Sequence, residues 1–104
     1  MLTTLILAAV AGGIIGAVVV FVLLHWREII NWFEKWMNRH ENVDKDAVGF
    51  TIREAIEKGK CKMVQGVFNK RTNKVEDARR IEAENVDAQT RETCLTGERV
   101  TIFN

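Results

Sequence analysis

Two cysteines and two histidines are the residues with the widest chemical range in this chain. Cys61 and Cys94 are far apart and form no CxxC motif, while His25 and His40 lie outside the segment that holds the cysteines. A structural zinc site needs four ligands at workable spacing, so we expect no metal site. No P-loop, dinucleotide fingerprint, nucleophile elbow or HExxH motif occurs. We therefore predict a non-enzymatic protein that carries no cofactor.

Taken singly, one cysteine and one histidine suggest more specific roles, as a reactive thiol and as a metal ligand. Lys60 and Lys62 flank Cys61 and would lower the pKa of a reactive thiol, but a small strand residue packed inward is the simpler interpretation. The imidazole of His25 could ligate a haem or a chlorophyll. Since no second ligand accompanies it, we interpret His25 as a polar residue at the end of an apolar segment. His40 fits a solvated helix end.

Basic residues are concentrated in the middle of the chain. The stretch from Lys58 to Arg80 is mainly basic, and the stretch from Glu82 to Glu98 is mainly acidic. The basic stretch could contact anionic lipid head groups, a phosphate-bearing ligand or the acidic stretch of a neighbouring copy, or could be ordinary solvated surface. A net charge of +1 argues against nucleic-acid binding. The candidate anion or lipid contacts are Lys58, Lys60, Lys62, Lys70, Arg71 and Lys74.

The N-terminal segment from Leu2 to Leu24 contains no charged residue. As a helix it would span roughly 34 Å, against about 30 Å for the hydrocarbon core of a bilayer. No basic residue precedes it and it is longer than a signal-peptide core, so we predict a retained transmembrane helix. Lys and Arg follow the segment, which predicts an outside N-terminus and a cytoplasmic C-terminal part in a cell (inner) or organellar membrane.

Small residues recur at four-residue intervals in this segment. Such small-xxx-small ridges let two helix backbones approach closely in a bilayer. We expect association with copies of the same chain or with helices of a larger membrane complex. The predicted helix-packing residues are Ala8, Ala9, Gly12, Gly13, Gly16 and Ala17.

Residues 25–41 show apolar side chains at spacings of three and four, which predicts an amphipathic juxtamembrane helix. The helix could continue the membrane helix as a stalk packed on a neighbour, or lie in the membrane interface. No Pro or Gly separates the two segments, so we favour the continuous stalk. Its apolar face consists of Trp26, Ile29, Ile30, Phe33, Trp36 and Met37.

Residues 42–104 predict a small α+β domain. We expect a short helix over 47–57, a β-hairpin formed by 61–68 and 75–83, a short helix over 86–95 and a final strand over 99–103. Residues 75–83 also suit a helix. Residues 69–74 have the composition of a turn.

The predicted fold class is thus a single-pass membrane protein. A transmembrane helix (1–24) continues into an amphipathic helix (25–41), followed by a small cytoplasmic α+β domain (42–104). We expect an accessory or assembly subunit that associates through its Gly/Ala helix face and docks its domain on a partner or on itself. The alternative is a homo-oligomeric pore-forming or membrane-perturbing effector with a ligand-sensing domain. The expected partners are the lipid bilayer and other membrane helices, without nucleic acid.

Overall fold

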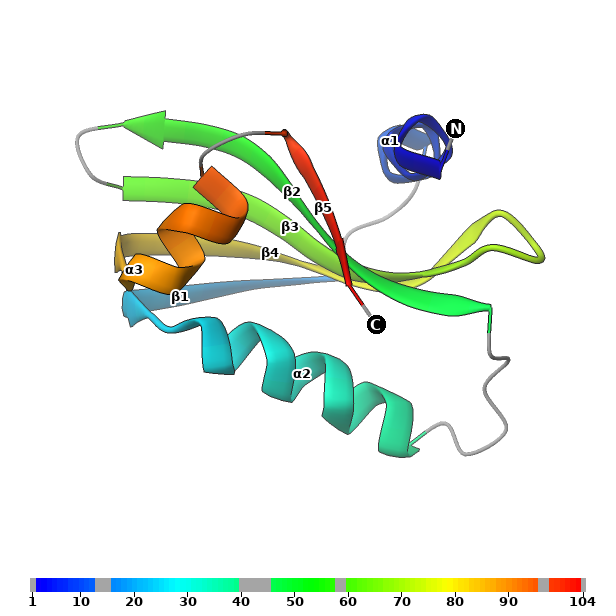
Figure 1. Cartoon of the computed structure of the whole chain (residues 1–104), viewed down its shortest axis with the longest axis horizontal. Helices are drawn as coiled ribbons and strands as arrows, with labels where there is room; N and C mark the ends of the chain where they lie inside the picture. Colours follow the sequence, from blue (N-terminus) through cyan, green and yellow to red (C-terminus); the bar gives the residue numbers. More distant parts are fainter. Residues whose placement is uncertain (1, 13–15, 40–45, 58–59, 96–97, 104) are drawn as a thin grey trace.

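The computed structural model describes residues 2–12, 16–39, 46–57, 60–95 and 98–103. They form an α+β domain built on a five-stranded mixed sheet with strand order β1-β4-β3-β2-β5 (Figure 1). The strands are β1 (Ala17–Leu24), β2 (Ala47–Glu57), β3 (Lys60–Asn69), β4 (Lys74–Val86) and β5 (Val100–Phe103). The helices are α1 (Leu2–Gly12), α2 (Trp26–Arg39), α3 (Ala88–Thr90) and the π-helical turn η1 (Arg91–Leu95).

The apolar N-terminal segment is divided between helix α1 and strand β1, which corrects the predicted single-pass fold. No helix in the described part of the chain combines the length and apolarity needed to cross a membrane. The predicted membrane location and orientation are therefore wrong. The physical reason is local: the sequence AVVVFVLL is rich in β-branched residues, which favour a pleated strand, and β4 supplies its hydrogen-bonding partner.

Strands β2, β3 and β4 form an antiparallel meander, and β5 pairs antiparallel with β2. Strand β1 instead runs parallel to β4, with Ala17 opposite Arg79 and Leu24 opposite Val86. The predicted hairpin is confirmed as β3 and β4, so residues 75–83 are strand. Its turn is closed by the Asn69 side chain, which accepts hydrogen bonds from the Arg71 and Thr72 amides at 2.9 and 3.3 Å.

The helix expected over residues 47–57 is strand β2 instead. Val48, Phe50 and Ile52 alternate along it and belong to one apolar cluster on a single face of the sheet. The short apolar run fits both a helix and a buried strand by periodicity, and pairing with β3 and β5 decides for the strand. The short helix predicted over residues 86–95 corresponds to α3 and η1, which follow β4. The final strand predicted over residues 99–103 contains β5.

The two longer helices cover opposite faces of the sheet (Figure 1). Helix α1 inserts Ile6 into the cluster that contains Phe50 and Phe68. Helix α2 buries Ile29, Phe33 and Trp36 on the other face, while Trp26, Ile30 and Met37 are half-buried. The predicted amphipathic helix is present, but its apolar face packs on the sheet of the same chain, and a strand precedes it in place of a helix.

Candidate functional site: the exposed edge of the sheet

Strand β1 forms one edge of the sheet and is strongly apolar. Val18, Val20 and Val22, here called the valine strip, are 61%, 68% and 74% exposed. Folded proteins usually protect an edge strand by shortening it or by placing charges, Pro or a bulge along it. Strand β1 has eight residues, none of them charged or Pro, and it keeps one offset from β4, although Val22 has no partner in the ladder. The β1 edge is therefore open to another strand.

The Leu24 carbonyl accepts a hydrogen bond from the Asp87 amide at 2.9 Å, so the backbone groups of Leu24 face β4. Phe21 and Leu24 both pack in the cluster under α2, and Val22 has no partner in the β1–β4 ladder, so the alternation of the strand is interrupted between them. Residues of one strand that direct their side chains to the same face direct their backbone groups to the same side. Phe21 and Val19 therefore face β4, and the residues whose backbone groups face away from the sheet, here called the outward residues, are Val18 and Val20.

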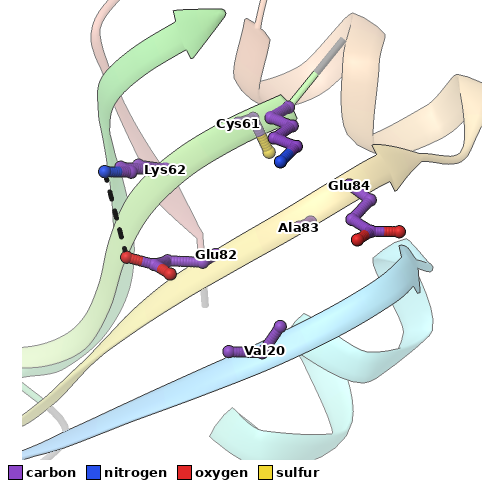
Figure 2. A pocket seen from close by; sticks show the side chains of 7 residues that line it. Val20, Cys61, Lys62, Glu82, Ala83 and Glu84 are labelled. Carbon is purple, nitrogen blue, oxygen red and sulfur yellow. Dashed lines mark ion pairs between the residues drawn. The ribbon is translucent and has the colours of Figure 1, made fainter.

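A hollow of about 410 Å³ lies beside the valine strip, over strands β1, β4 and β3 (Figure 2). Val20 lines one side of it. Glu82 on β4 and Lys62 on β3 form an ion pair at 4.0 Å, and both side chains are partly exposed. Glu84 lines the same hollow near the end of β4. The surface is thus apolar on β1 and carries the Lys62–Glu82 ion pair, whose charges balance, on the neighbouring strands β3 and β4.

The Cys61 thiol adjoins this hollow but belongs to the core. The residue is only 1% exposed and packs in the cluster under helix α2. Burial raises the pKa of the thiol, and the charge of Arg91 offsets this only in part. This outcome disagrees with the reactive-thiol interpretation drawn from Lys60 and Lys62, and it agrees with a small strand residue packed inward.

On the α2 side, Arg79 is held between two aromatic rings at the margin of β1. Its guanidinium carbon lies 5.2 Å from the Trp32 ring centroid and 5.9 Å from that of Phe21. Its Nε donates to the Gln65 side-chain oxygen at 3.0 Å, and Gln65 donates to the Ile29 carbonyl at 2.6 Å. Burial lowers the pKa of Arg79, an effect that the charge of Glu28 opposes. These contacts fix β1 to helix α2 through the Phe21 ring.

Asp87 joins the ends of β1 and β4 by capping two helices at once. Its Oδ1 accepts from the Thr90 amide of α3 at 2.8 Å, and its Oδ2 accepts from the Trp26 amide at the start of α2 at 3.1 Å. His25 Nδ1 lies 3.6 Å from Oδ2. Desolvation raises the pKa of Asp87, but hydrogen bonding from Thr90 and Trp26 and the charge of His25 outweigh it, so the pKa is lowered overall.

The predicted helix-packing residues do not share one helix. Ala8, Ala9 and Gly12 lie in α1, whereas Gly16 precedes β1 and Ala17 begins it. Gly13 lies outside the described residues, as does His40. Of the two alanines, Ala9 packs against the sheet core and Ala8 is exposed.

The predicted basic contacts are also divided. Lys60 and Lys62 lie at the start of β3, while Lys70, Arg71 and Lys74 lie at the turn that follows its end. The nearest members of the two groups, Lys62 and Lys70, are eight residues apart along β3 and its turn, or roughly 27 Å, so the groups do not form one anion site. Lys58 lies outside the described residues. Sequence reasoning overlooked the β1 edge, although the run of valines in AVVVFVLL was a strand signal.

Comparison with known proteins adds no relative: the chain matches no protein-family model, no curated protein and no solved structure at a significant level. Within the described residues, no three His, Cys, Asp or Glu side chains are grouped so that they could hold a metal ion. The β1 edge and the surface beside it are therefore the features from which we argue function.

Proposed function

We propose that this chain is a protein-interaction module that binds an uncharged, apolar β-strand along the edge of β1. The observation that supports this proposal is the eight-residue uncharged edge with a valine strip that is 61–74% exposed. Association was also expected from the sequence, but through a helix face. The proposal moves the contact to a strand edge.

Strand addition suits this edge for two reasons. The outward residues, Val18 and Val20, present backbone donors and acceptors with which a new strand can pair. The apolar side chains on both faces of β1 favour apolar side chains on the added strand, since cross-strand pairs are the unit of sheet stabilisation. A charged residue opposite Val18, Val20 or Val22 would lose water without gaining a partner on β1.

A synthetic strand peptide of alternating Thr and Val, with a Lys at each end for solubility, tests the proposal. We expect its addition to shift the backbone amide NMR signals of Val18 and Val20, because these amides point outward. Val20→Lys should weaken this binding at least tenfold, while the same substitution at Leu5, an exposed residue of α1, should leave it unchanged. Equal binding by the two variants would refute the β1 edge as the binding surface.

A further inference from the structure

We infer that a hollow between helix α1 and the sheet binds a medium-chain fatty acid, that is, a single alkyl chain with an anionic carboxylate head. The hollow has a volume of about 490 Å³, within the range of roughly 300–1,000 Å³ that is typical of small-molecule sites. It lies on the α1 side of the sheet, and no described residue of β1 lines it. A ligand in this hollow would therefore leave the β1 edge free.

The part of the hollow next to the core is apolar. Ile52 on β2 and Val64 on β3 line it from the sheet, and Leu7 and Val10 line it from α1. All of these side chains belong to the apolar cluster on the α1 side of the sheet. Ala11, an exposed residue near the end of α1, also lines the hollow, and its short side chain leaves space that an alkyl chain can occupy. The hollow thus offers a binding surface for an apolar tail.

The charged residues that line the hollow are two arginines and one glutamate. Arg80 and Glu54 form a bidentate ion pair: Arg80 Nε donates to Oε1 at 2.9 Å, and Nη2 donates to Oε2 at 3.3 Å. This pair balances its own charges. Arg99 therefore adds one positive charge that no described residue lining the hollow neutralises. An apolar hollow with one excess positive charge complements a ligand that has an alkyl chain and a single negative charge.

Arg99 is held through its Nε group. This group donates to the Arg53 carbonyl at 3.1 Å, and the Arg53 amide donates to the Arg99 carbonyl at 2.9 Å, which fixes Arg99 directly before β5. In the described part of the chain, neither Nη atom of Arg99 donates to a further protein group. The two Nη groups form a planar fork that matches the two oxygens of a carboxylate. A carboxylate is therefore the head group that Arg99 is placed to bind.

Isothermal titration calorimetry with octanoate, hexanoate, acetate and neutral octanol tests the class of ligand. We expect octanoate to bind about fifteenfold more tightly than hexanoate, because each buried methylene gains about 0.8 kcal/mol, and acetate not to bind measurably. Octanol should bind roughly tenfold more weakly than octanoate, because it forms no charged hydrogen bond with Arg99. No binding of octanoate at millimolar concentration, or equal binding of octanoate and octanol, would overturn the inference.

Substitutions locate the site. Arg99→Gln should weaken octanoate binding roughly tenfold and leave octanol binding unchanged, whereas Arg39→Gln, in the last turn of α2, should change neither. Ala11→Leu should fill the hollow and weaken the binding of both ligands. Ala8→Leu is the matched control, because Ala8 is exposed on the same helix and does not line the hollow. Equal octanoate binding by folded Ala11→Leu and Ala8→Leu proteins, with folding checked by circular dichroism, would overturn the site.

Vesicles of phosphatidylglycerol separate a free fatty acid from a lipid in a bilayer. The alkyl chains of a bilayer lipid lie in the membrane interior and cannot reach Ile52 and Val64 beneath α1, so we expect no co-sedimentation of the chain with these vesicles. Co-sedimentation with the vesicles without binding of free octanoate would overturn the inference.

Discussion

Replacing Asp87 by Ala removes the caps of two helices with one substitution. The carboxylate accepts from the Thr90 amide in α3 and from the Trp26 amide at the start of α2. Loss of one cap typically costs 0.5–2 kcal/mol, with a typical value of about 1, so we expect a loss of about 2 kcal/mol in the free energy of unfolding. Urea unfolding at pH 7, followed by tryptophan fluorescence, measures this difference.

The effect of Asp87→Ala should depend on pH in a definite direction. Folding lowers the pKa of this carboxyl, so its stabilisation is complete above the ordinary Asp pKa of about 3.9. The stabilisation is lost as the pH falls through the lower pKa of the folded state. The difference between wild type and Asp87→Ala should therefore shrink toward pH 2.

Asp77→Ala is the matched control for Asp87→Ala. Within the described part of the chain, the Asp77 side chain accepts a hydrogen bond only from the adjacent Ala78 amide, at 2.8 Å, and caps no helix. We expect Asp77→Ala to change the free energy of unfolding by less than about 0.5 kcal/mol. A cost for Asp87→Ala no larger than that of Asp77→Ala, or a cost that does not fall in acid, would refute the double-cap reasoning.

Two further predictions concern the interior of the sheet. Gly66→Ala should destabilise the protein by about 1–3 kcal/mol, because a Cβ there would lie 2.6 Å from the Phe50 ring and 2.7 Å from a β4 carbonyl oxygen. Thermal unfolding checks this against Gly16→Ala, whose Cβ would meet only a carbonyl at 3.8 Å and should cost little. Cys61 should react with iodoacetamide at least tenfold more slowly in the folded protein than in urea, since it is buried and its thiol pKa is raised. Equal rates of Cys61 alkylation in the folded protein and in urea, measured by mass spectrometry, would contradict the buried position of Cys61.

The parts of the fold that sequence reasoning predicted correctly are those with strong local signals. The apolar spacing of Ile29, Phe33 and Trp36 identifies helix α2 and its buried face. The turn composition between β3 and β4 identifies the hairpin, because Asn69 closes the turn through its own side chain. Both signals lie within a few residues of the structure that they determine.

The errors arise where distant pairing decides between two local possibilities. The segment from Leu2 to Leu24 is apolar throughout, and apolarity alone does not distinguish one long helix from a short helix followed by a strand. The strand forms because β4 pairs with it in parallel, a contact between residues such as Ala17 and Arg79 that no local pattern reveals. The candidate site was missed for the same reason, because the β1 edge can be inferred only after residues 17–24 are assigned to a strand.

The parallel pairing of β1 with β4 has a consequence for the order of folding during synthesis. Trp26 and the Asp87 that caps it are 61 positions apart, so β1 leaves the ribosome well before its partner strand is made. At 5–20 residues per second, the delay is about 3–12 s. Until residues 74–87 are made, the AVVVFVLL segment has neither β4 nor Asp87 to hold it. Nascent chains on one polysome therefore present the same unpaired apolar strand to each other, and a chaperone that shields residues 17–24 until residue 87 emerges would raise the yield of folded protein.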